Sequence, residues 1–132
     1  MAGQGHLHHL ELYVSDLAVA VDFWGWLLTD LGWECRQEWD EGCAYALGDT
    51  ALVLVQAPEG AGRLDRRSSG LNHLAFRADS EAEVDRITEE FRRRGVRILY
   101  PDRHPFAGGT DHYAVFCEDP EGLKVEVVAP AT

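Results

Sequence analysis

Three residues with metal-binding side chains, His9, His73 and Glu126, lie far apart in the chain, each in a short strand-like run. Successive side chains of a strand point to opposite faces, so each run separates its apolar residues from its polar ones. Two imidazoles and one carboxylate are a sufficient ligand set for a divalent ion that keeps open coordination positions. The sequence therefore predicts a metal site at these residues, for an ion that is Fe, Mn, Co, Ni or Zn.

Further polar side chains share the expected faces of these strands or lie next to them. Glu11 and Arg77 are expected on the site-facing side, where the alternative is a structural ion pair between strands. Lys124, the only lysine of the chain, is suited to an anionic group of a substrate, and an exposed strand position is the alternative. Glu11 is also suited to orient a ligand histidine. The predicted substrate-pocket residues are Glu11, Tyr13, Arg77, His112 and Lys124.

Tyr113 follows a loop over residues 101–111 that is rich in Pro and Gly. A loop of this kind often carries functional groups or closes over a site. Tyr113 is therefore the candidate catalytic residue, as an acid or a hydrogen-bond donor.

Composition excludes several classes of function. A length of 132 residues suits one domain with a core. The net charge of -11 argues against a nucleic-acid partner, and no apolar run reaches the roughly 20 residues of a membrane span. No secretory signal is recognisable.

Three cysteines without CxxC spacing indicate reduced thiols in a cytoplasmic protein, with a Cys35–Cys43 bridge as the alternative. The arginine clusters at 66–67 and 92–94 are interpreted as solvated surface.

The chain repeats a β-α-β-β-β pattern. The first module is expected to contain a strand at 7–14, a capped helix at 17–30, and strands at 33–39, 43–47 and 51–56. The second is expected to contain a strand at 72–78, a capped helix at 81–94, and strands at 96–99, 112–118 and 123–128. We place module one at about 6–57, a Gly- and Ser-rich linker at about 58–70, and module two at about 71–130, within one domain of residues 1–132.

Two features of this repeat point to a known family. One is the pair of runs 9–17 and 73–79, in which a histidine precedes a helix cap by about seven residues. The other is the turn at 119–122, Asp-Pro-Glu-Gly, which leads into an apolar-Glu-apolar strand. They resemble the vicinal oxygen chelate superfamily, which contains glyoxalase I, fosfomycin-resistance proteins, extradiol dioxygenases and bleomycin-resistance proteins. The resemblance implies an α+β, glyoxalase-like fold, whose two modules form a half-barrel around a metal and substrate cavity.

The resemblance also shows where this chain departs from its relatives. By position, His9, His73 and Glu126 match three family ligands. Glyoxalase I places a carboxylate at the last-strand position of module one, where this chain has Val53 or Leu54. The extradiol dioxygenases carry an acid–base tyrosine where this chain has Phe116. A three-ligand site is therefore expected, without a simple assignment to either enzyme.

The resemblance implies a metal-dependent enzyme that chelates a small oxygenated substrate and stabilises an oxyanion or enolate. Isomerase, lyase, thiol transferase and dioxygenase chemistry all stay open. The alternative is a non-catalytic ligand-binding protein of the bleomycin-resistance type, which the acidic charge fits but the two histidines and the glutamate do not. A homodimer is expected from the same resemblance, with the site built within one chain or across two.

Overall fold

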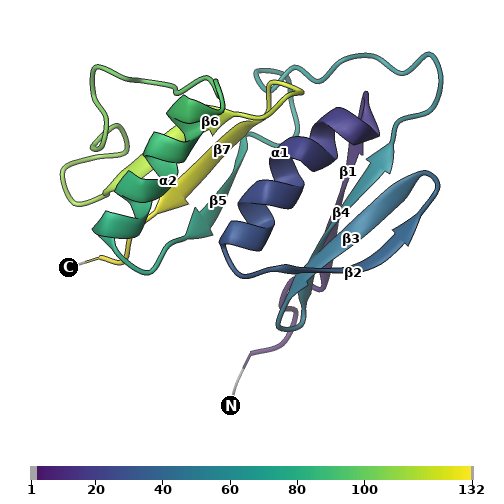
Figure 1. The fold of residues 1–132 in the computed structure, drawn as a ribbon, viewed down its shortest axis with the longest axis horizontal. Coiled ribbons are helices and arrows are strands. Elements are labelled where there is room, and N and C mark those ends of the chain that lie inside the picture. The colour runs from purple at the N-terminus through teal and green to yellow at the C-terminus, as the bar shows by residue number, and fades with distance from the viewer. Residues whose placement is uncertain (1–2, 132) are drawn as a thin grey trace. The chain divides into compact units, whose positions relative to one another are not determined.

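The computed structural model describes residues 3–131, which divide into two compact units at Arg63 and Leu64. Each unit contains one helix and one small sheet (Figure 1). The first unit consists of β1 His9–Val14, α1 Leu17–Asp30, β2 Glu34–Trp39, β3 Gly42–Leu47 and β4 Thr50–Gln56. The second consists of β5 His73–Arg77, α2 Glu81–Arg93, β6 Ala114–Glu118 and β7 Lys124–Val128. The expected α+β class is confirmed.

In the first unit, the four strands follow the order β1-β4-β3-β2, with β1 and β4 parallel. Asp16 begins α1, because its carboxylate accepts a hydrogen bond from the Val19 backbone N–H at 3.3 Å. The helix contacts β2, β3 and β4. It buries one apolar stripe, and the middle of β4 is buried as well. These buried residues are Phe23, Trp24, Leu27, Leu28, Leu52 and Leu54.

The second unit repeats this plan, with the order β5-β7-β6 and a parallel β5–β7 pair. Ser80 begins α2 by accepting a hydrogen bond from the Glu83 N–H at 3.1 Å. The helix contacts β6 and β7 and buries Val84, Ile87 and Phe91. Odd-numbered residues of the two strands are fully buried, namely Val115, Cys117, Val125 and Val127. The even-numbered residues, including Glu126, therefore lie on the face turned away from α2.

The prediction of a strand at 96–99 is wrong. This segment forms only an isolated bridge between Ile98 and Cys117, with a hydrogen bond from the Leu99 N–H to the Phe116 carbonyl at 2.8 Å. Tyr100 has a φ of 54°, a left-handed conformation that ends the extended segment at once. The bridge still lies beside β6, so the second unit keeps the strand order of the first.

The turn before β7 is built by Asp119. Its carboxylate accepts hydrogen bonds from the backbone N–H groups of Glu121 and Leu123, both at 2.8 Å. Gly122 has a φ of 87°, which a side chain would disfavour. This turn fixes the start of β7, and Glu126 follows on that strand.

The arginine cluster at 66–67 is not wholly solvated, contrary to the sequence interpretation. The Arg66 side chain is 26% exposed, pairs with the Glu118 carboxylate and donates to the Gly122 carbonyl at 2.9 Å. An arginine that bonds a carboxylate and a carbonyl together has a fixed side chain and a structural role. The cysteines of the described residues are free thiols, and no described helix has the length and hydrophobicity to cross a bilayer.

Candidate metal centre

Glu126 lies at the centre of β7 with only 5% of its side chain exposed. One of its oxygens, Oε1, is 3.0 Å from Nε2 of His73. The other, Oε2, bonds Nε2 of His112. A buried carboxylate is costly unless its oxygens are satisfied, and here each oxygen has one imidazole partner.

His73 is held from its other side by its neighbour in the chain. Its Nδ1 lies 2.6 Å from the Oδ1 atom of Asn72. An N–H at Nδ1 that donates to this carbonyl leaves Nε2 of a neutral imidazole with a lone pair. That lone pair and the carboxylate of Glu126 then face each other as two acceptors, an arrangement that a proton or a metal cation between them would stabilise.

His112 depends on a glycine for its position. A Cβ added at Gly108 would lie 2.4 Å from Cδ2 of His112, closer than real Cβ contacts allow. The loop before β6 therefore leaves room for the imidazole only because residue 108 has no side chain. The sequence predicted His112 as a pocket residue, but its bond to Glu126 was not foreseen.

Tyr113 lies on the face of the sheet that is turned toward α2, opposite to the face with Glu126 and His112. Its hydroxyl donates to the Asp85 carboxylate of α2 at 2.5 Å, which raises the pKa of Tyr113 to about 12. The residue is directed toward the helix, and Glu126 is on the other face. Arg77 is exposed at the end of β5.

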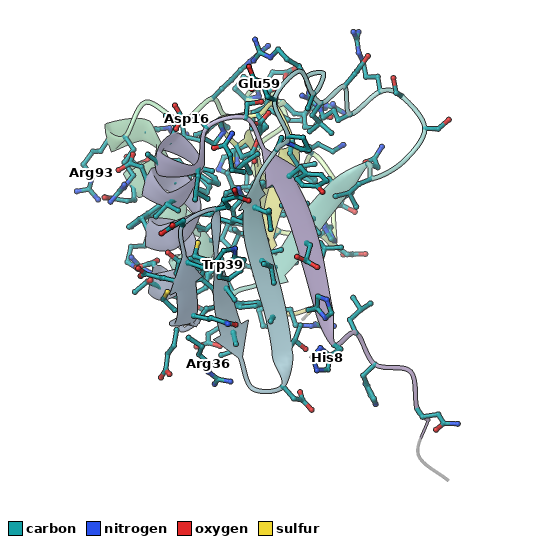
Figure 2. The ribbon with its side chains drawn as sticks, turned by 90° about the vertical axis from the view of Figure 1, so that its right-hand side faces the viewer. His8, Asp16, Arg36, Trp39, Glu59 and Arg93 are labelled. Atoms are coloured by element: carbon teal, nitrogen blue, oxygen red, sulfur yellow. The ribbon has the colours of Figure 1, made fainter. Side chains whose placement is uncertain are left out.

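In the first unit, His9 is more open than His73. Its side chain is 46% exposed, against 31% for His73, and its Nε2 is 3.7 Å from a Glu11 oxygen. Its Nδ1 lies 2.9 Å from Nδ1 of His8, which stands at the start of β1 in Figure 2. Glu11 and Tyr13 line a cavity of about 220 Å³ together with Leu12 and Val55.

Strand register identifies the module-one counterpart of Glu126. In the second unit, Glu126 pairs with Ala75, two residues after His73. In the first unit, the residue two after His9 is Glu11, and it pairs with Val53. Val53 rather than Leu54 therefore occupies the matching position, and the carboxylate of that pair is on β1 instead of β4.

The donor set of the second unit fits two positions of a metal site. Nε2 of His73 and Oε1 of Glu126, which are 3.0 Å apart, are donor atoms of the kinds that divalent metals take from proteins, and they would hold part of the ion's coordination shell. Within residues 3–131, however, no three His, Cys, Asp or Glu side chains are grouped so that they could hold a metal ion.

Comparison with known proteins identifies the family. Residues 6–127 match the model of the Glyoxalase/Bleomycin resistance protein/Dioxygenase superfamily. The chain belongs to this superfamily. Members of the superfamily commonly use a divalent metal and bind small-molecule substrates. The family resemblance inferred from the histidine runs and the Asp-Pro turn is confirmed.

Individual relatives of this superfamily member include proteins of known and unknown role. The uncharacterized protein YqjT of Bacillus subtilis (strain 168) is 52% identical over 95% of this chain and 99% of its own length. Glutathione transferase FosA of Serratia marcescens is 29% identical, covering 92% of this chain and 78% of its own.

Solved structures support the same fold. One from Bacillus halodurans is 52% identical with a TM-score of 0.94, covering 96% of this chain and 97% of its own. Lactoylglutathione lyase from Agrobacterium tumefaciens is 25% identical with a TM-score of 0.68, covering 97% and 96%. The expected glyoxalase-like fold is therefore confirmed.

Proposed function

We propose that this protein is a metal-dependent enzyme in which His9, His73 and Glu126 hold one divalent ion. The ion is Fe, Mn, Co, Ni or Zn, and it binds a small substrate through two neighbouring oxygens. The single observation that carries this proposal is the buried Glu126 carboxylate, whose Oε1 lies 3.0 Å from Nε2 of His73. His9 comes from the first unit, of the same chain or of a second copy.

When bound, the metal supplies Lewis-acid stabilisation of negative charge that develops on a substrate oxygen. The protein residues have separate tasks. His73 and Glu126 present their donor atoms, and Asn72 keeps the His73 ring turned toward Glu126. His112 bonds the second oxygen of Glu126 and so fixes the direction of the first. We therefore assign His112 as a positioning residue for the ligand Glu126.

The proposed reaction class follows from the named relatives and from Phe116. Both glutathione transferase FosA and lactoylglutathione lyase carry glutathione in their names. Phe116 pairs with Glu126 across β6 and β7, at the place where the dioxygenases carry an acid–base tyrosine. A phenyl ring cannot transfer a proton. These two observations favour lyase, isomerase or thiol-transfer chemistry over oxygenation.

Metal analysis of protein purified without a histidine tag tests the proposal. We expect one divalent ion per chain in the wild type and loss of that ion in His9→Ala and His73→Ala. His6→Ala is the matched control, because His6 is exposed and precedes β1. Wild-type protein that takes up no stoichiometric metal from any of the five ions would contradict the proposal, and would favour the non-catalytic ligand-binding alternative.

A substrate screen of the metal-loaded protein then separates the reaction classes. It includes the methylglyoxal–glutathione hemithioacetal, fosfomycin with a thiol, and catechols. We expect turnover with one of the first two and none with catechols. Activity on catechols alone would overturn the assignment that rests on Phe116.

We also propose that the protein is a cytoplasmic homodimer. The free thiols fit a reducing compartment. All of β2 is exposed along the edge of its sheet, and such edges often pair with another chain. Light scattering at micromolar concentration tests this, with a mass of 29 kDa, about twice the 14.7 kDa chain, as the expected result. If the metal site is shared between copies, dilution to monomers will release the metal.

A further inference from the structure

A cavity of about 410 Å³ opens in the second unit beside the start of β7. Its wall combines residues of the 57–72 segment with Tyr100 and Lys124. The lining contains three cationic side chains and no carboxylate, although the whole chain carries a net charge of -11. Such a local excess of positive charge attracts anions, and Lys124 contributes most to it because Arg66 is paired with Glu118 and Arg67 lies 3.6 Å from Asp65. The lining residues are Arg66, Arg67, Ser68, Ser69, Gly70, Asn72, Tyr100 and Lys124.

Lys124 is the cation best placed to meet an anion in this cavity. Its Nζ donates to the Tyr100 hydroxyl at 3.3 Å, and it lies 5.6 Å from the Tyr100 ring centre and 5.8 Å from that of Phe116. Aromatic rings hold an ammonium group without neutralising its charge. Within residues 3–131, Lys124 forms no ion pair with a carboxylate, so its charge is available to a ligand.

The 57–72 segment contributes a fixed part and an adaptable part. Arg66 is the fixed part, because the Glu118 carboxylate and the Gly122 carbonyl hold it. Arg67 is the adaptable part, with 89% of its side chain exposed and a distance of 3.6 Å to Asp65. An exposed pair of this kind contributes little to stability, so Arg67 can change partner. Ser69 adds a hydroxyl that makes no hydrogen bond among the described residues.

The cavity is next to the proposed ligands. Asn72 lines the cavity and also bonds His73 at 2.6 Å. Lys124 is the direct strand partner of His73 and precedes Glu126 by two residues on the same face. Two residues of a strand span about 7 Å. The backbone positions of Lys124 and Glu126 are therefore close enough for one small substrate to contact both side chains.

We propose that this cavity binds an acidic group of the substrate, a phosphate, phosphonate or carboxylate, through Lys124, Arg67 and Ser69. This inference rests on the proposed function for the chelating end of the substrate, and it adds the substrate class. The substrate is a small acid that carries an anionic group in addition to its chelating oxygens. A charged donor facing an oxyanion forms the stronger kind of hydrogen bond.

Calorimetric titration of metal-stripped protein with inorganic phosphate, and separately with acetate, tests the cavity. We expect at least one anion to bind the wild type and to bind Lys124→Gln about 10–100-fold more weakly, the loss of one charge-assisted contact. The matched control is Arg93→Gln, which removes the same charge from an exposed position on α2 (Figure 2) and should leave anion binding unchanged. The preferred anion assigns the acidic group as phosphoryl or carboxylate.

The metal-free assay separates this inference from the proposed function. Anion binding that depends on Lys124 supports the cavity even if no variant holds metal. If the protein holds stoichiometric metal but binds neither anion, the proposed anion site is wrong and the proposed metal site stands. Equal affinity in Lys124→Gln and wild type also overturns it. Ser69→Ala gives a second measurement if Lys124→Gln has a lowered melting temperature. We expect Ser69→Ala to bind the anion several-fold more weakly than the wild type.

Discussion

The two units have the same strand order but place their carboxylates differently. In the second unit, Glu126 is on the last strand, is 5% exposed and has an imidazole at each oxygen. In the first unit, Glu11 is on the first strand, is 56% exposed and has one imidazole at 3.7 Å. Their strand partners, Ala75 and Val53, have no polar side chain. Both units therefore have one carboxylate at the same level of the corresponding strand pair. The buried one is held in place by its partners, and the exposed one is free to move.

The largest expected effect concerns whether the two units unfold separately. Phe91 is fully buried under α2, so Phe91→Ala should lower the unfolding free energy of the second unit by about 3–5 kcal/mol. All four tryptophans are in the first unit, at positions 24, 26, 33 and 39. In Phe91→Ala, we expect the urea midpoint measured by circular dichroism to fall more than the midpoint measured by tryptophan fluorescence. Equal shifts would show that the units unfold together.

The contrast between the two carboxylates is tested by removing each in turn. Glu126→Ala should weaken metal binding by more than the roughly 10–100-fold typical of residues that only support a ligand. Glu11→Ala should change it by less than that, because Glu11 is open to solvent and is not a proposed ligand. Competition with a chelator measures both affinities. A larger loss in Glu11→Ala would reverse the assignment of ligand and neighbour.

A smaller effect is expected where the backbone of the second unit makes room for His112. Gly108→Ala should displace the imidazole, which would lie 2.4 Å from the new Cβ, and weaken metal binding by about 10-fold through Glu126. Gly62→Ala is the control, since an added Cβ there meets nothing within 4 Å. Its metal affinity should equal that of the wild type. If Gly108→Ala binds metal equally well, His112 does not position Glu126.

The smallest effect concerns Tyr113 at alkaline pH. Its hydroxyl donates to Asp85, and the pKa is raised to about 12 from an ordinary value near 10. The folded state thus keeps this proton more tightly than the unfolded state, so the stabilisation is complete below pH 10 and is lost between pH 10 and 12. Tyr113→Phe should lose less stability than the wild type between pH 10 and 12 in urea titrations.

Tyr13→Phe serves as the control for this titration. Tyr13 is 69% exposed in the first unit, and its removal should leave the alkaline loss of stability as in the wild type. A Tyr113→Phe profile that matches the wild type would mean that the hydrogen bond to Asp85 does not persist in solution.

The sequence predicted most of the secondary structure because local signals were strong. Asp16 and Ser80 cap the helices that their positions predicted. The segment at 96–99 failed because alternation alone does not reveal that Tyr100 adopts a left-handed conformation. An arginine pair next to Ser and Gly looks like solvated surface, and only the tertiary fold shows that Arg66 reaches Glu118.

The candidate site was predictable in composition and less so in geometry. Strand parity placed Glu126 and Lys124 on one face, and the register then distinguished Val53 from Leu54. The same parity could not foresee that Tyr113 is directed to Asp85, because that bond depends on how α2 lies against the strands. The pairing of His112 with Glu126 requires a loop path that no residue pattern specifies.

The crossed positions of Glu11 and Val53, compared with Ala75 and Glu126, have a consequence for protein design. Each strand pair carries one carboxylate, on the first strand in one unit and on the last strand in the other. Two substitutions at these facing residues would therefore move the carboxylate of the first unit from one strand to the other. Exchanging the pair in the laboratory, with Glu11→Ala and Val53→Glu together, would give the first unit the carboxylate placement of the second.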